Sequence, residues 1–263
     1  MEDQMFQTKQ HDILKIRFNL IAYEIVMKTI ERWREAGRRR YVAITNPHSV
    51  LLCHRDEQMF RATLEAGMVL PDGVGILLAA RLLGYRHYGR ATGPTLMLKL
   101  CDWGRKNGYR HFFYGGAEGV AARLAANLSN EFPGLKVAGA CFPPFRPLTD
   151  EEDRSMVEKI NSAKPDIVWV GLGAPKQEKW MADHLGRIKA TVMIGVGAAF
   201  DFHSGNIKWA PALIRRLGLE WAYRLAQNPK RMWRRNLDSP LFLSKVMGQR
   251  LSNILRRESQ AVH

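Results

Sequence analysis

The chain has 263 residues, of which 46% are apolar and 10% aromatic, so it is long enough to bury a substantial core of ordinary α/β composition. The three cysteines lack CxxC spacing, which argues against a disulfide framework and against a zinc site. No apolar stretch is suited to a membrane span or a signal peptide, so we expect a cytoplasmic protein. The formal net charge of +15 predicts an anionic partner, which could be nucleic acid, anionic lipid or a phosphorylated substrate.

Hydrophobic periodicity and turn residues predict strands and helices that alternate along the chain. A strand near 18–21 is followed by a helix at 24–36, a strand at 41–45, helices within 48–67, a strand at 68–70, and helices at 73–83 and 94–106. Further strands begin near residues 111, 135, 167 and 192, and a helix covers 149–162. This alternation is typical of an α/β protein, and we predict a Rossmann-like, mostly parallel sheet with helices on both faces, in two lobes.

Three of these strands are predicted to run directly into glycine turns. Because the carboxyl ends of parallel strands meet at one edge of a sheet, the turns are expected to converge on a ligand site. Backbone N–H groups and the positive end of a helix dipole would face an anion there, and a nucleotide diphosphate is the best candidate. The residues that these turns bring to the predicted site are Gly115, Gly116, Gly173, Gln177 and Asp201. An acid in the first turn of a helix also simply complements the helix dipole, which is the alternative explanation for Asp201.

Asp72 follows a predicted buried strand and precedes Gly73, which places its carboxylate at the mouth of the sheet. An acid at such a position is costly unless it is solvated, caps a helix or takes part in chemistry. Aspartate is among the preferred helix N-cap residues, so a structural role explains it. A carboxylate that is ionised at pH 7 is also suited to take a proton from an attacking hydroxyl, and the two roles are compatible.

Another strand end and a loop supply further candidates. Thr45 and Asn46 end a strand before a proline and can face the same cleft, although strand-end capping explains them nearly as well. Arg90 lies in a glycine-rich loop, from which its guanidinium would reach a phosphate or carboxylate through two hydrogen bonds. An ordinary surface arginine is the alternative for Arg90.

The sequence lacks the motifs of several cofactor and metal enzymes. The glycine turns do not form GxGxxG, because Lys176 and Phe200 occupy the third-glycine positions, and no GxxxxGK[ST] occurs. Neither the histidine spacing nor any Asp-x-Asp pair indicates a metal site. We therefore expect no cofactor and no metal, so arginines and helix N-termini would have to stabilise a departing nucleotide.

In their order along the chain, these features resemble the WecG/TagA/CpsF family, glycosyltransferase family 26. The resemblance covers nearly everything from residue 16 to residue 236. It rests on Thr45-Asn46, Pro71-Asp72-Gly73, Arg90 with Thr92-Gly93, the runs 113–116, 171–178, 195–202 and 204–205, and then 218–221, Arg224 and 229–231.

The resemblance implies an inverting, metal-independent transferase of cell-surface or exopolysaccharide biosynthesis. Such an enzyme moves a hexose, which is N-acetylmannosamine, its uronate or glucose, from a UDP-sugar to a polyprenyl-diphosphate-linked sugar at the cytoplasmic membrane face. The oligomeric state stays open, a homo-oligomer included. By resemblance, Asp72 is the catalytic base, Thr45 and Arg90 are active-site residues, Gln177 and Asp201 bind the donor, and Arg224, Arg231 and Arg234 belong to a mobile appendage that closes over the diphosphate.

Basic charge is concentrated after residue 206, where we place the boundary between an α/β core, residues 1–206, and a C-terminal segment, residues 207–263. Between Lys208 and Arg257, twelve basic residues stand against two acidic ones. Interleaved aromatic residues would stack on bases in a nucleic-acid-binding protein, which is the main alternative function. Their alternation with leucines favours an amphipathic helix on an anionic membrane and no nucleic acid, although core packing explains the first half of the segment about equally well.

Residues 239–263 extend past the part of the chain that resembles the family. Their apolar side chains are predicted to form one face of an amphipathic helix, with the basic residues largely outside it. That apolar face comprises Leu241, Phe242, Leu243, Val246, Met247, Leu251, Ile254 and Leu255.

Overall fold

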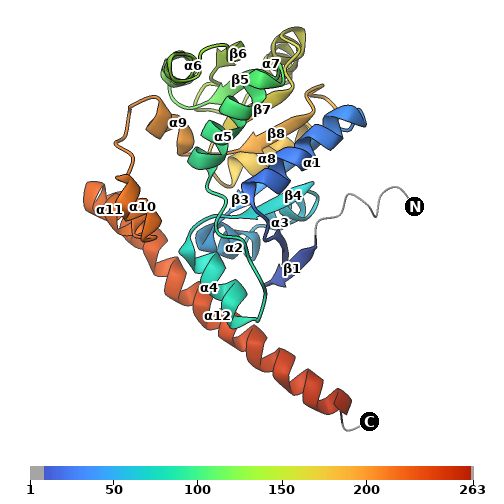
Figure 1. Cartoon of the computed structure of the whole chain (residues 1–263), viewed down its shortest axis with the longest axis vertical. Helices are drawn as coiled ribbons and strands as arrows, with labels where there is room; N and C mark the ends of the chain where they lie inside the picture. Colours follow the sequence, from blue (N-terminus) through green and yellow to red (C-terminus); the bar gives the residue numbers. More distant parts are fainter. Residues whose placement is uncertain (1–8, 262–263) are drawn as a thin grey trace.

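The computed structural model describes residues 9–261, apart from the side chains of residues 231, 234–236, 257, 258, 260 and 261. Its centre is a six-stranded sheet in the order β4-β3-β8-β7-β5-β6, with every neighbouring pair parallel (Figure 1). The α/β, Rossmann-like prediction is confirmed. The strands are β3 (Arg40–Thr45), β4 (Met68–Pro71), β5 (Arg110–Gly115), β6 (Lys136–Cys141), β7 (Ile167–Gly171) and β8 (Val192–Gly195).

Side chains of the central strands alternate between the two faces of the sheet, and both faces are buried. In β3, Tyr41 and Ala43 join one core cluster, whereas Val42 and Ile44 join the other. Helices supply the opposite wall of each cluster, as predicted. The first cluster takes side chains from α2 (Pro47–Cys53), α3 (Glu57–Leu64), α4 (Val74–Leu82), α7 (Asp150–Ser162) and α8 (Lys176–Asp183), and the second from α1 (Tyr23–Glu35), α5 (Gly93–Lys106), α6 (Val120–Glu131) and α9 (Ala199–His203).

An N-terminal hairpin departs from the prediction of a single strand at 18–21. Strand β1 (Gln10–Ile13) pairs antiparallel with β2 (Ile16–Asn19). The turn between them consists of Leu14 and Lys15, which adopt φ values of 52° and 67°. Tight hairpin turns with positive φ usually carry glycine or asparagine, so neither residue gives a turn signal and the hairpin escapes prediction.

The two predicted lobes share one continuous sheet, because β3 pairs directly with β8. The register runs from Arg40 opposite Val192 to Val42 opposite Ile194. The carboxyl ends of β4, β3, β8 and β7 consequently lie next to one another along one edge. In open parallel sheets this edge is where ligands bind.

The C-terminal segment is helical and its longest helix is anchored to the core. The middle of that helix packs against α2 and α4, and its last turns project beyond the core in Figure 1. Gln249 ties it to the hairpin, since its Oε1 accepts from the Leu14 N–H at 2.9 Å and its Nε2 donates to Asp12 Oδ1 at 3.0 Å. The three helices are α10 (Ala212–Arg216), α11 (Glu220–Gln227) and α12 (Pro229–Ala261).

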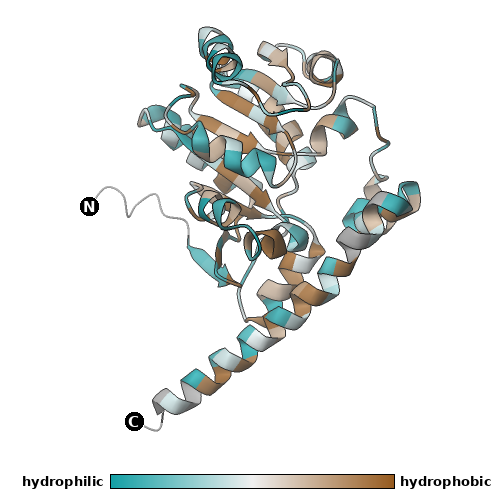
Figure 2. Ribbon diagram, turned by 180° about the vertical axis from the view of Figure 1, so that it is seen from behind, coloured by the Kyte–Doolittle hydropathy of each residue, from teal (hydrophilic) through white to brown (hydrophobic). Residues whose placement is uncertain are grey.

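Apolar side chains of α12 divide into two groups, which corrects the prediction of one membrane-facing stripe. Phe242 and Val246 are fully buried and belong to the first core cluster, so the prediction was wrong for them. Further along, apolar and polar residues alternate on the projecting end (Figure 2). The exposed apolar residues of the predicted stripe are Leu241, Met247, Leu251, Ile254 and Leu255.

Candidate active site

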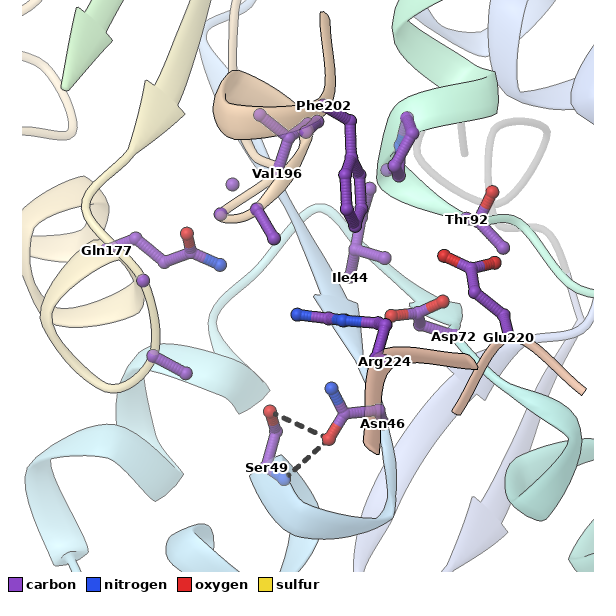
Figure 3. A pocket seen from close by; sticks show the side chains of 18 residues that line it. Ile44, Asn46, Ser49, Asp72, Thr92, Gln177, Val196, Phe202, Glu220 and Arg224 are labelled. Carbon is purple, nitrogen blue, oxygen red and sulfur yellow. Dashed lines mark hydrogen bonds between the residues drawn. The ribbon is translucent and has the colours of Figure 1, made fainter. Parts of the chain in front are cut away.

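A pocket lies at the carboxyl ends of β3, β4, β7 and β8, with α11 along one side (Figure 3). It encloses about 100 Å³. Both the core and the C-terminal segment therefore contribute to its wall. The pocket is lined by Ile44, Asn46, Ser49, Asp72, Thr92, Gly93, Pro94, Gly173, Ala174, Gln177, Gly195, Val196, Gly197, Ala198, Ala199, Phe202, Glu220 and Arg224.

Asp72 reaches this pocket directly from the end of β4. Pro71 pairs with Thr45 in the sheet, and the Asp72 N–H donates to the Thr45 carbonyl at 2.9 Å, which extends the ladder by one bond. The N-cap of α4 is Gly73, with φ 80° and no side-chain capping bond. Gly73 rather than Asp72 is therefore the N-cap residue of α4, and the Asp72 carboxylate lines the pocket.

Thr45 lies next to the site without lining it. Its side chain is almost fully buried at the end of β3, and it is outside the pocket wall. What Thr45 visibly contributes is the backbone carbonyl that holds Asp72. A direct catalytic role for Thr45 stays a prediction.

Asn46 lines the pocket and also caps α2. Its Oδ1 accepts from the Ser49 N–H at 3.1 Å and from the Ser49 hydroxyl at 3.4 Å (Figure 3). Asn46 therefore does act as a cap, and these hydrogen bonds hold its amide at the pocket wall. Asn46 Nδ2 is the end of the side chain that this cap does not use, which leaves the amide suited to donate to a ligand oxygen.

The glycine turn after β7 supplies the opposite wall through Gly173 and Gln177. Gly173 adopts φ +75°, and a Cβ there would meet open space, so the backbone is bare toward the pocket. The Gln177 side chain is only 5% exposed, and its Nε2 donates to Glu178 Oε1 at 2.9 Å. Among the described residues, Gln177 Oε1 has no hydrogen-bond partner. A buried acceptor of this kind is available to an N–H or O–H group of a ligand.

Three predicted binding residues are not brought into the pocket. Gly115 ends β5 and Gly116 follows it, both outside the pocket wall. A Cβ on Gly115 would lie 2.6 Å from the Gly171 carbonyl carbon, so strand packing accounts for that glycine. Asp201 lies in α9 outside the wall, where its Oδ1 accepts from Asn206 Nδ2 at 3.4 Å. Their contact with a substrate stays a prediction.

Predicted cationic residues approach the site from two directions. Arg224 of α11 lines the pocket, and its guanidinium carbon lies 5.4 Å from the ring centroid of Phe202. Arg90, on the loop between α4 and α5, lies outside the wall and donates from Nη2 to the backbone carbonyl of Arg215 in α10. This bond links the core loop to the C-terminal segment. The side chains of Arg231 and Arg234 lie outside the described residues.

Glu220 is a pocket residue that the sequence reasoning missed. It begins α11, is half-buried and points into the pocket beside Asp72 (Figure 3). Burial raises the pKa of the Glu220 carboxyl above its ordinary value, and the nearby Asp72 charge raises it further, while Arg90 and Arg224 act in the opposite direction. The sequence feature that could have pointed to Glu220 is that it is one of only two acidic residues in the strongly basic segment between Lys208 and Arg257.

The part of the chain that the structure describes offers neither a metal site nor a membrane-spanning helix. Within it, no cluster of three or more His, Cys, Asp and Glu side chains could hold a metal ion. In the same residues, no helix is both long and apolar enough to cross a bilayer.

Comparison with known proteins identifies the family of this chain. The Glycosyl transferase WecG/TagA/CpsF family matches residues 11–256. A Bacillus subtilis N-acetylglucosaminyldiphosphoundecaprenol N-acetyl-beta-D-mannosaminyltransferase is 34% identical over 207 residues, 78% of each chain. Proteins with the same name are 32% identical over 81% of this chain and 80% of the relative in Bacillus spizizenii, and 27% identical over 91% and 92% in Staphylococcus aureus. The chain therefore belongs to the WecG/TagA/CpsF family of glycosyl transferases.

Proposed function

We propose that this protein transfers an N-acetylmannosaminyl group from a UDP-linked donor to N-acetylglucosaminyl-diphosphoundecaprenol at the cytoplasmic face of the membrane. The observation that carries the proposal is the Asp72 carboxylate in a pocket at the carboxyl ends of four parallel strands. The family's glycosyl transferases, and the name shared by the relatives reported above, supply the reaction class.

In the proposed reaction, direct displacement at the anomeric carbon requires a base and a way to stabilise the departing UDP. Asp72 takes the proton of the acceptor hydroxyl as that oxygen attacks. Arg224, which lines the pocket, supplies positive charge for the diphosphate, and Arg90 adds positive charge from outside the wall, where it acts on Glu220. Gln177 and the bare backbone at Gly173 are placed to contact the donor from the opposite wall.

N-acetylmannosamine is preferred to its uronate and to glucose because all three relatives carry N-acetylmannosamine in their names. The pocket chemistry is compatible with a neutral sugar. Two carboxylates, Asp72 and Glu220, already line the wall, and a uronate would add a third negative charge to them.

We propose that the C-terminal segment moves when a nucleotide sugar enters the pocket. A cavity of about 100 Å³ is far smaller than the ~300–1,000 Å³ of sites that hold drug-sized ligands, and a nucleotide sugar belongs to the larger class. Glu220 and Arg224 form the part of the wall that α11 contributes. We take the structure to be the closed form, in which displacement of α11 admits the donor.

Membrane contact is the proposed role of the exposed apolar residues in the C-terminal segment. Leu213, Leu217 and Trp221 are 68%, 64% and 49% exposed at one end of it, among basic residues. Trp209 is less suited to stack on a nucleic-acid base, because Arg215 covers its ring at 3.7 Å. This arrangement favours an anionic bilayer over nucleic acid.

A donor screen tests the proposed function. The full chain would be incubated with a lipid-linked N-acetylglucosamine diphosphate and with UDP-N-acetylmannosamine, its uronate or UDP-glucose, and UDP release and lipid-linked product would be measured together. We expect product with UDP-N-acetylmannosamine alone. Transfer from one of the other donors would overturn the sugar assignment, and no transfer from any donor would overturn the function.

A further inference from the structure

Two carboxylates face each other in the pocket, and they come from parts of the chain 148 positions apart. Asp72 ends β4 in the core, whereas Glu220 begins α11 in the C-terminal segment. Figure 3 shows both carboxylates directed into the same part of the pocket. Two negative groups at such proximity are unfavourable, so an arrangement that brings them together across the fold calls for an explanation.

Among the described residues, the surroundings of Glu220 offset this repulsion only in part. Arg90, Arg224 and the Trp209 side chain lower the pKa of the Glu220 carboxyl, whereas the Asp72 charge raises it. Desolvation is the largest influence, and the net result is a raised pKa for the Glu220 carboxyl. Glu220 thus binds a proton more readily than an exposed glutamate, even with two arginines nearby.

We propose that Glu220 is the second carboxylate of the catalytic base, which keeps Asp72 basic by its negative charge and shares the proton that Asp72 removes from the acceptor. This inference rests on the proposed function and deepens it. Glu220 is a positioning residue here, because it acts on the reacting hydroxyl through Asp72. Closure of α11 then completes the base as well as the pocket wall.

The proton balance of the step is simple. The acceptor oxygen forms a bond to the anomeric carbon while the bond from that carbon to the β-phosphate oxygen breaks, and UDP leaves with the electron pair. The acceptor proton passes to Asp72 and is then shared with Glu220. Release of this proton to water after α11 opens restores the two ionised carboxylates.

A purely structural role for Glu220 is the competing explanation. An acid in the first turn of α11 interacts favourably with the helix dipole, and pairing with Arg90 or Arg224 would dock the helix. Such a role predicts lower stability or weaker closure after substitution. It does not predict a change in the pH at which the base titrates.

The test compares pH–kcat profiles of the full-length wild type, Glu220→Gln and Glu220→Asp. Loss of the neighbouring charge makes Asp72 a weaker base, so in Glu220→Gln we expect the acid limb to move roughly one pH unit lower and kcat at the optimum to fall roughly 3- to 10-fold. Glu220→Asp keeps the charge and should retain the wild-type limb. Glu131→Gln, an exposed site on α6, is the matched control and should leave the profile unchanged.

If the acid limb of the pH–kcat profile stays at its wild-type position in Glu220→Gln, the inference is overturned, whether or not kcat falls. The pH dependence of stability needs no transfer activity, so it tests the carboxylate pair separately from the proposed function. Because the folded-state pKa of Glu220 is raised, the wild type loses stability as pH rises above the unfolded pKa toward the folded one. Glu220→Gln lacks this loss, so the difference between its unfolding midpoint and that of the wild type should increase in favour of the variant from pH 4 to pH 8. This increase should be smaller when both proteins also carry Asp72→Asn. If wild type shows no transfer with any donor, the function fails. If the midpoints show no such coupling, the carboxylate pair fails.

Discussion

The core and the C-terminal segment build the same pocket by different means. In the core, strands buried on both faces end at one edge and fix Asp72, Asn46 and Gly173 through the backbone of the sheet. All side chains of α10 and α11 are described, and none of them is fully buried, yet α11 supplies Glu220 and Arg224. We propose that the core holds the groups that must be placed accurately, and that α11, which has no fully buried side chain, brings charges that arrive and leave with the substrate.

The sharpest test of the core's share is Asp72→Asn. The amide keeps the shape of the side chain but cannot accept a proton, so transfer should fall by about 10² to 10⁴-fold. UDP affinity, measured by calorimetry, should stay close to wild type, because the fold and the cationic side of the pocket are unchanged. Near-normal turnover would show that the core supplies no base and would move the chemistry to the C-terminal segment.

Phe242→Ala tests whether the C-terminal segment is separable from the core. This side chain is fully buried between α12 and the core, and a phenylalanine truncated in such a position typically costs about 3–5 kcal/mol of unfolding free energy. Urea unfolding followed by tryptophan fluorescence measures the change. Leu255→Ala, at a site 63% exposed on the same helix, is the control and should cost little. Equal, small effects in both variants would mean that α12 docks too weakly to count as part of the core.

Deletion of residues 251–263 separates membrane contact from catalysis. It removes the exposed Leu251, Ile254 and Leu255 but keeps Phe242 and Gln249, which anchor α12. Each basic residue near an anionic leaflet contributes about 1 kcal/mol, so loss of Arg256 and Arg257 with these apolar side chains should weaken liposome binding by tenfold or more. Turnover on a short-chain soluble acceptor should be unaffected. Loss of that activity with intact liposome binding would reverse the assignment.

The smallest expected effect is that of metal removal. In the proposed reaction, arginines in both parts of the molecule supply the positive charge for the departing diphosphate, so excess EDTA should leave the transfer rate within about twofold of the untreated enzyme. The comparison is made on the same preparation with and without added Mg²⁺ or Mn²⁺. Activity abolished by EDTA and restored by either ion would show that the arginines are insufficient.

Local features of the fold and site could be predicted from the sequence because they depend on neighbouring residues. Strands that run into glycines or prolines gave the parallel sheet, and the strand ends gave Asp72, Asn46 and Gly173 as pocket residues. The same rule placed Gly115 and Gly116 near a ligand, although β5 ends outside the pocket and a tight approach to β7 accounts for Gly115. A glycine required for packing and a glycine required for binding look alike in one sequence.

Long-range features could not be predicted in this way. No periodicity links α11 to β4, so the meeting of Glu220 with Asp72 is visible only once the chain is folded. The apolar spacing of α12 is equally compatible with a membrane and with a core, and it turned out to serve burial at Phe242 and Val246. The Leu14-Lys15 turn was missed because its residues adopt positive φ without the usual glycine.

The length of α12 constrains how the enzyme can sit on a bilayer. Its 33 residues, at ~1.5 Å rise each, make a rod of about 50 Å that starts next to the pocket-lining helix and ends beyond the core. If that rod stood upright with only its tip in the lipid, the pocket would be lifted far from the headgroups, out of reach of a sugar joined to its lipid by a diphosphate alone. For the proposed acceptor and the proposed membrane contact, we therefore expect α12 to lie nearly flat on the surface, so that its orientation sets the height at which transfer takes place.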